Sequence, residues 1–134
     1  MSNHYLEKAS SACYNLQTLS IMRFSVNHFI EIRSYNLKPG RRDEFHRLVV
    51  EQSMPMLTRW NVDVVAFGPS LHDENSYYLI RRYDSLAHRA ESEDAFYGSD
   101  EWRQGPREAI IALIESSTEI VLELDEVTLR GLRK

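Results

Sequence analysis

Three polar residues spaced two apart, Glu31, Arg33 and Tyr35, are the clearest candidates for chemistry in this chain. Successive side chains of a β-strand point to opposite faces, so these three would share one face of a strand. An arginine in a cavity wall suits an anionic ligand, and a tyrosine can donate a hydrogen bond or a proton. A structural ion pair between Glu31 and Arg33 explains the same pattern, and we favour it, because ion-pair networks also perturb charged groups without catalysing anything.

A pair of adjacent arginines, Arg81 and Arg82, is the second candidate. In a strand they would point to opposite faces, so one of them could join Glu31 or Arg33 on a neighbouring strand. Arg81 is therefore included in the candidate ligand site, where two arginines on one wall would bind a carboxylate. The alternative, which we favour, is one surface arginine and one partner for a buried acid.

Other chemistries find little support in the residues present. Cys13 is the only cysteine, which excludes an intramolecular disulfide. The chain has no GxGxxG motif, P-loop or GxSxG nucleophile elbow, so we expect no cofactor. We also expect no metal, because four histidines lack the spacing of a metal-binding motif: His28, His46, His72 and His88.

Composition places the chain among single-domain globular proteins. It has 134 residues, of which 27% are charged and 43% hydrophobic. The net charge is −4, and residues 84–126 carry 12 acids and 3 bases, which argues against binding to nucleic acid. No apolar run approaches the ~20 residues of a membrane span. Because the start of the chain also lacks the pattern of a secretory signal, we expect a cytoplasmic protein.

The hydrophobic pattern predicts the element order β-α-β-β-α-β. Alternating or β-branched segments predict four strands, and apolar residues at helical spacing predict the helices. We expect Asp84 to cap the second helix and Pro55 to disturb the end of the first. The predicted strands cover residues 28–37, 62–67, 77–83 and 118–124, and the predicted helices cover residues 41–53 and 85–96, followed by an apolar helical stripe at 109–114.

The domain is expected over residues 27–126. Residues 1–26 show no clean periodicity, and we interpret them as a mobile leader, with Met22 as an alternative start. Residues 127–134 are expected to form a short basic tail.

Two right-handed crossovers in this order give an α+β, ferredoxin-like fold, in which both helices cover one face of a four-stranded antiparallel sheet. The other face is predicted to carry Phe29, Tyr35 and Leu37, which should not remain in contact with water together. A second copy of the same sheet is the simplest cover, so we expect a two-fold homodimer with these residues at its interface.

Three ordered segments resemble the NIPSNAP family. Phe29, Glu31, Arg33 and Tyr35, followed by Leu37-Lys38-Pro39-Gly40, resemble its opening ELRxYxLKPG pattern, with Ile32 in the place of the family's leucine. The segment from Tyr83 to Arg89 resembles its YDSLxxR pattern, and Asp100-Glu101-Trp102 its DEW stretch. The resemblance implies a dimeric α+β barrel with a ferredoxin-like subunit, and little about chemistry.

The chain departs from that family on the third strand. Many members carry a HLWxY pattern there, whereas this chain reads Leu79-Ile80-Arg81-Arg82-Tyr83. Any ligand role of the family's histidine and tryptophan is therefore in doubt for this chain.

Two hypotheses about function follow. The first is a homodimeric binding or interaction module that takes a small anionic or aromatic ligand at Glu31, Arg33, Tyr35 and Arg81. The second is a cofactor-independent enzyme, monooxygenase- or isomerase-like, that acts on a small polar or aromatic substrate in a barrel cavity. The second rests on analogy of fold, and fold does not fix function.

Overall fold

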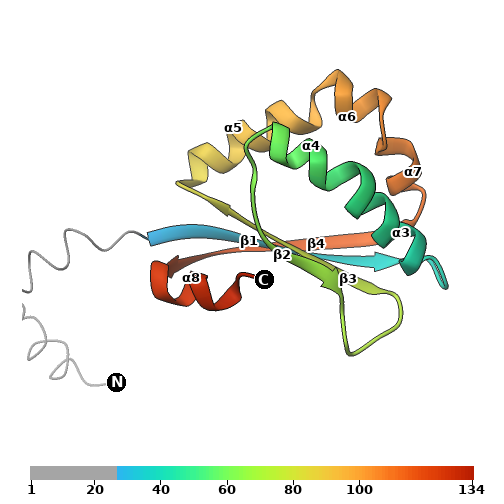
Figure 1. The fold of residues 1–134 in the computed structure, drawn as a ribbon, viewed down its shortest axis with the longest axis horizontal. Coiled ribbons are helices and arrows are strands. Elements are labelled where there is room, and N and C mark those ends of the chain that lie inside the picture. Colours follow the sequence, from blue (N-terminus) through green and yellow to red (C-terminus); the bar gives the residue numbers. More distant parts are fainter. Residues whose placement is uncertain (1–26) are drawn as a thin grey trace, which may run out of the picture.

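The computed structural model describes residues 27–134, so the expected leader at residues 1–26 lies outside the described residues. Four antiparallel strands form one sheet in the order β2-β3-β1-β4 (Figure 1). They are β1 (Asn27–Leu37), β2 (Asp63–Pro69), β3 (Ser76–Tyr83) and β4 (Ile114–Asp125). The predicted α+β fold with its antiparallel sheet is confirmed. Because β1 and β3 are central neighbours, Glu31 lies directly opposite Arg81.

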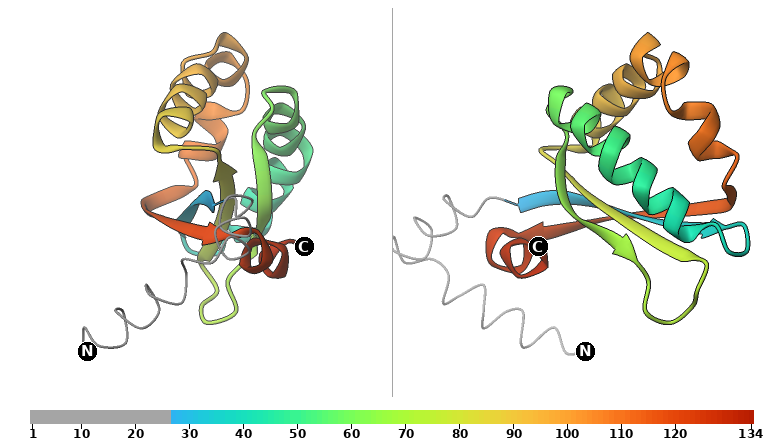
Figure 2. Two further views of the ribbon diagram at one scale, coloured as in Figure 1. Left: turned by 90° about the vertical axis from the view of Figure 1, so that its left-hand side faces the viewer. Right: turned by 45° about the vertical axis from the view of Figure 1, so that its right-hand side comes forward.

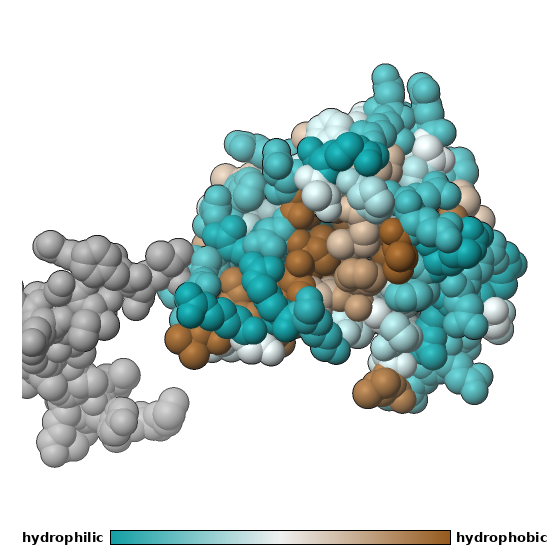
Figure 3. Space-filling model, viewed as in Figure 1, coloured by the Kyte–Doolittle hydropathy of each residue, from teal (hydrophilic) through white to brown (hydrophobic). Residues whose placement is uncertain are grey.

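Two groups of helices cover one face of the sheet (Figures 1 and 2). The first group, between β1 and β2, consists of α3 (Arg42–Leu48), the π-helical turn η1 (Val49–Ser53) and α4 (Met54–Arg59). The second, between β3 and β4, consists of α5 (Leu86–Tyr97), α6 (Asp100–Gln104) and α7 (Arg107–Ile111). Figure 3 shows apolar side chains gathered in a band between the helix layer and the sheet. No helix within residues 27–134 has the length and apolar character needed to cross a bilayer.

The first helical segment continues past residue 53, where the sequence prediction ended it, although the helix is irregular just before Pro55 as expected. Pro55 occupies the first turn of α4, directly after η1. A proline ring clashes with the carbonyl four residues earlier in a regular helix, and it removes one hydrogen bond. The wider π-helical turn before Pro55 relieves this conflict, so the helical path continues to Arg59.

The two faces of the sheet are exchanged relative to the sequence prediction. Leu37 is only 2% exposed and packs under the helices together with Phe45. The ring of Tyr35 also lies against Phe45, with 5.2 Å between centroids. The prediction that Tyr35 and Leu37 belong to an open dimer interface is therefore wrong. It is also wrong for Phe29, because strand alternation places Phe29 on the same face as Tyr35 and Leu37. The sequence prediction chose the wrong face because β1 carries apolar residues on both faces.

The face turned away from these helices is also apolar. It carries Ile30 and Val65, which are buried, with further aliphatic side chains packed around them: Ile32, Ile80, Leu122 and Leu124. Ile120, opposite Ile32 in the register, remains 63% exposed.

The end of the chain belongs to the domain, which corrects the predicted basic tail. Residues Glu126–Leu132 form α8, which covers part of the second sheet face (Figure 1). Leu129 is 1% exposed and packs on Ile30 and Val65. Arg133 then binds both carboxylate oxygens of Asp63, at 2.8 and 2.7 Å. Sequence analysis missed α8 because it offers only one short apolar stripe.

The N-cap of α5 is Ser85, not Asp84 as the sequence predicted. The Ser85 hydroxyl accepts a hydrogen bond from the backbone N–H of His88 at 2.9 Å. Asp84 instead accepts a hydrogen bond from Arg82. We expect Ser85→Ala to lower the free energy of unfolding by about 1 kcal/mol and Asp84→Ala to lower it by much less. Urea denaturation of both variants checks this, and a larger loss for Asp84→Ala would contradict the assignment.

Candidate functional site

A buried ion pair joins the two central strands. Arg81 Nη2 donates a hydrogen bond to Glu31 Oε1 at 2.5 Å, and the two side chains are 1% and 0% exposed. From α5, Arg89 Nε donates to the other oxygen, Glu31 Oε2, at 2.6 Å. Both carboxylate oxygens of Glu31 are thus held by arginines. Arg82 lies on the opposite face, where its Nε donates to His28 Nδ1 at 2.6 Å. Arg81 is therefore the partner of a buried acid, as the favoured interpretation had it, whereas Arg82 is only 21% exposed and is not a free surface arginine.

The pair extends into a charge network of six residues: Glu31, Arg33, Arg81, Arg89, Glu93 and Glu119. Arg33 Nη2 contacts Glu119 and lies 3.4 Å from Glu93 Oε1. Arg33 Nε lies 3.4 Å from Glu31 Oε1, which agrees with the structural ion pair that the sequence pattern favoured. The network thus contains three acids and three arginines. Sequence reasoning missed Glu93, although Arg89, Glu93 and Tyr97 have the four-residue spacing of one helix face.

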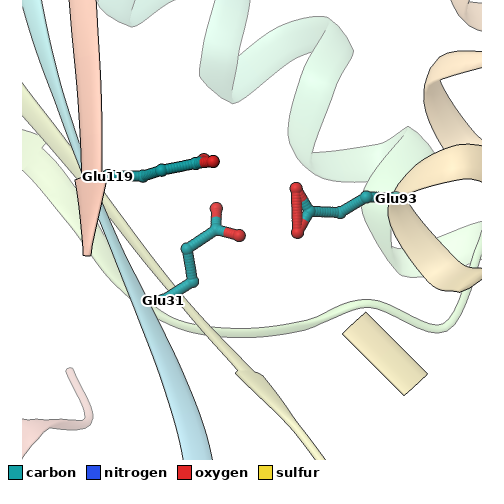
Figure 4. Close-up of side chains that lie close together, drawn as sticks. All are labelled: Glu31, Glu93 and Glu119. Atoms are coloured by element: carbon teal, nitrogen blue, oxygen red, sulfur yellow. The ribbon is translucent and has the colours of Figure 1, made fainter. Parts of the chain in front are cut away.

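The three carboxylates of this network point toward one another, two from strands and one from α5 (Figure 4). One oxygen of each lies within 4.8 Å of the others, which raises the question of a metal ion. Each carboxylate, however, is already contacted by at least one arginine. Guanidinium groups supply the positive charge that a cation would bring, so this donor set does not fit a metal site.

Burial and mutual contact separate the pKa values of Glu31 and Glu93. Burial opposes the ionisation of Glu31, but a hydrogen bond from Glu93 and the charge of Arg81 lower its pKa to about 2. Burial and the contact with Glu31 raise the pKa of Glu93 to about 7, although Arg81 opposes the shift. The two carboxyl groups therefore titrate as a coupled pair, in which Glu93 holds a proton near neutral pH.

Replacing Glu93 by glutamine should flatten the pH dependence of stability. Because the folded-state pKa of Glu93 lies above its ordinary value of 4.5, its stabilising contribution is complete below pH 4.5 and is lost as the pH rises to about 7. The wild type should therefore lose on the order of 1–3 kcal/mol between pH 5 and pH 8, at about 1.4 kcal/mol per pKa unit. Glu93→Gln should lose much less.

Urea denaturation at the two pH values measures this difference, with Glu91→Gln on an exposed position of α5 as the matched control. Equal pH profiles for Glu93→Gln and Glu91→Gln would show that Glu93 does not hold the proton.

A cavity of about 740 Å³ lies beside the charge network, between the sheet and α6 and α7. We call it the outer cavity. Three of its lining residues are arginines, against one acidic residue, Glu108, which contacts Arg107. Most of the other walls are aromatic or aliphatic. The lining consists of Arg33, Tyr35, Tyr97, Trp102, Arg103, Arg107, Glu108, Ile110, Ile111, Ile114 and Ser117.

Tyr97 connects the charge network to the outer cavity. Its hydroxyl oxygen accepts hydrogen bonds from Arg81 Nη1 at 2.9 Å and from Arg33 Nη1 at 3.5 Å. With the oxygen occupied by two donors, the hydroxyl proton is left for another acceptor. The ring stands edge-on to Trp102, with 5.5 Å between centroids. Tyr35 lines the same cavity, and burial raises its pKa to about 12, so its phenol is protonated at neutral pH.

A second, smaller cavity of about 40 Å³ lies in the apolar core next to the outer one, and we call it the inner cavity. Val49 and Ser53 from η1 line one side of it. Four residues line both cavities: Tyr35, Tyr97, Trp102 and Ile110. Unfilled apolar space costs stability, about 1 kcal/mol for this volume at ~24 cal/mol per Å³.

The four residues predicted for the ligand site thus divide into two pairs. Arg33 and Tyr35 line the outer cavity, whereas Glu31 and Arg81 are buried beneath it as an ion pair. Sequence analysis named Trp102 only as part of the DEW stretch, and it did not identify Arg103 and Arg107 at all. No motif links these positions to β1, because only the packing of α6 and α7 brings them to it.

Comparison with known proteins gives a family and a fold. The family model described as NIPSNAP matches residues 30–124. No curated protein sequence matches the chain significantly.

Several solved structures are similar to this chain. A NIPSNAP family protein from Agrobacterium tumefaciens superposes with a TM-score of 0.69 at 20% identity, over 76% of this chain and 90% of that one. Another from the same organism, described as having unknown function, gives 0.67 at 23% identity, over 73% and 88% of the two chains. A putative antibiotic biosynthesis monooxygenase from Bordetella bronchiseptica gives 0.57 at 20% identity, over 73% and 95%. At these identities the likeness shows the fold alone.

Proposed function

The chain belongs to the NIPSNAP family, and we propose that it binds a small organic anion in the outer cavity. The observation that carries this proposal is the excess of arginines on otherwise aromatic and aliphatic walls. The volume of about 740 Å³ falls in the range typical of small-molecule sites, which combine apolar walls with a few polar groups. A carboxylate attached to a ring or an alkyl group matches both parts of this lining.

The charge network supports the proposal by fixing Arg33. Its guanidinium is contacted by Glu119 and lies near Glu31 and Glu93, so the side chain is held in place without a ligand. A preorganised arginine loses less conformational entropy on binding than a mobile one. Arg103 and Arg107 lie outside the network, which makes them suitable for testing the site without unfolding the domain.

Removing the two outer arginines should weaken anion binding and leave stability unchanged. We expect Arg103→Gln and Arg107→Gln each to raise the Kd for benzoate several-fold, because a charge-assisted hydrogen bond contributes about 1.5–3 kcal/mol and these positions are partly exposed to solvent. Isothermal titration gives Kd, and thermal melting checks the fold. Arg130→Gln on α8 is the matched control, since Arg130 lies outside the cavity lining. Equal benzoate affinity in all three variants would reject the outer cavity as the anion site.

A homodimer through the second sheet face is part of the same proposal. Aliphatic side chains from β1, β3 and β4 form this face, and Ile120 is largely exposed on it. A flat apolar sheet face is complementary to a two-fold copy of itself, and a second copy would remove it from water. The expected interface is therefore Ile32, Ile80, Ile120 and their neighbours, in place of Tyr35 and Leu37.

One observation favours a second candidate function, a cofactor-independent acid–base enzyme. Glu93 carries a proton near pH 7, and it lies 3.4 Å from Arg33 in the cavity wall. A group that titrates near neutrality suits general acid–base catalysis. The fold likeness to a putative monooxygenase adds only analogy. Oxygen uptake with small hydroquinones that disappears in Glu93→Gln would support this candidate, and uptake unaffected by that change would oppose it.

A further inference from the structure

The outer and inner cavities share part of their lining. Tyr35, Tyr97, Trp102 and Ile110 line both of them, so the two cavities meet at these residues. Aromatic and aliphatic side chains change rotamer far more readily than a backbone segment moves. A group bound in the outer cavity can therefore reach the inner one by small displacements of these four side chains.

The two cavities differ sharply in chemistry. The outer cavity is lined by three arginines and one glutamate, whereas no charged side chain of residues 27–134 lines the inner one. Apart from Ser53 and the tyrosine hydroxyls, the inner lining is aliphatic or aromatic, with Phe45, Leu57 and Phe96 among its members. An apolar cavity of this kind binds apolar groups rather than water.

The inner cavity adjoins an irregularity of the backbone. Val49 and Ser53 both belong to η1, and both are buried against it. Val50, the next residue in the same turn, is 46% exposed and is not part of the cavity lining. π-helical turns of this kind are frequent at functional sites. The wide turn before Pro55 therefore does more than accommodate the proline, since it also forms one wall of the inner cavity.

We propose that the ligand is an amphipathic carboxylate: an aromatic acid whose short apolar substituent enters the inner cavity while its carboxylate is held at the arginines of the outer one. This inference rests on the proposed anion site and adds the class of ligand. The polar end lies at Arg33, Arg103 or Arg107, the ring lies along Tyr97 and Trp102, and the substituent points toward η1. The limited volume of the inner cavity sets a maximum substituent length of a few carbon atoms.

A series of para-alkylbenzoates tests the inference by isothermal titration. In the wild type, Kd should fall about fourfold for each added carbon, from benzoate to the ethyl or propyl derivative, and then rise again. Val49→Leu and Ser53→Val fill the inner cavity, so both should bind benzoate normally and lose the gain from the alkyl group. Val49→Ala enlarges it and should move the optimum to a longer substituent. Val50→Leu is the matched control and should follow the wild type.

The outcomes separate this inference from the proposed function. Binding of benzoate without any dependence on alkyl length would overturn the inference and leave the anion site intact. A gain that persists in Val49→Leu and Ser53→Val would place the substituent elsewhere and would overturn it as well. Failure of every benzoate to bind would overturn both proposals. Thermal melting of the two filling variants, expected at or above the wild-type temperature, shows that the fold is retained.

Discussion

Replacing Arg81 with methionine should lower the free energy of unfolding by about 3–5 kcal/mol, because it leaves a buried carboxylate without its main partner. Glu31 is 0% exposed, and Arg81 donates to it at 2.5 Å from the neighbouring strand. Arg89 would remain on the other oxygen, but it lies nearer to solvent and is shared with Glu119. The same change removes the 2.9 Å hydrogen bond to Tyr97 and so disturbs the cavity wall.

Two further variants make this prediction specific. Arg82→Met removes the neighbouring arginine on the opposite face, which donates to His28 and pairs with the exposed Asp84, and should cost only about 1–2 kcal/mol, because it leaves no buried carboxylate unpaired. The double variant Arg81→Met, Glu31→Met removes both charges and should recover much of the loss, since apolar replacement of a buried ion pair is often nearly neutral. Urea denaturation measures all three. A loss for Arg81→Met no larger than that for Arg82→Met would contradict the buried pair.

Placing a charge on the second sheet face should convert the protein from dimer to monomer. We expect a mass about twice 15.7 kDa by light scattering at low micromolar concentration. Ile120→Asp would bury two aspartates in the proposed interface, which should raise the dissociation constant more than about 100-fold, or about 2.7 kcal/mol. Ile120 is 63% exposed in the single chain, so the substitution should leave the subunit folded.

Leu86→Asp is the control, because Leu86 is also exposed, at 58%, but begins α5 in the helix layer. It should remain dimeric. A wild-type monomer at this concentration would contradict the proposed dimer.

The sequence predicts the order of the strands and the adjacency of β1 and β3, because both follow from local patterns and crossover handedness. Once β1 and β3 are expected to be neighbours, an arginine of β3 is also expected to lie beside an acid of β1. The pairing of Arg81 with Glu31 was therefore within reach of sequence reasoning.

The face covered by the helices could not be predicted in the same way. Phe29, Tyr35 and Leu37 alternate with Ile30 and Ile32, so both faces of β1 are apolar and the pattern does not distinguish them. The burial of Leu37 against Phe45 shows which face of β1 the helices cover. That contact depends on how the first crossover packs on the sheet. For the same reason, the sequence prediction places Tyr35 and Leu37 on the open face, whereas they lie under the helices.

The cavity depends on contacts that no local pattern encodes. Arg33 lies on β1, Tyr97 on α5, and Arg103 and Arg107 on two short helices that follow it. Each residue has an ordinary local explanation, as a strand ion pair, a core aromatic or an exposed helix charge. Their convergence, like the π-helical turn at η1, arises only from tertiary packing.

The most direct test of the anion site is a crystal structure of the full chain soaked with para-bromobenzoate, since anomalous scattering locates the bromine independently of the model phases. The account predicts one strong bromine peak against Tyr97 and Trp102, where the outer and inner cavities meet, with the carboxylate within hydrogen-bonding distance of at least one of Arg33, Arg103 and Arg107. A bromine peak only outside this cavity, or an empty cavity in crystals soaked to saturation, would contradict it.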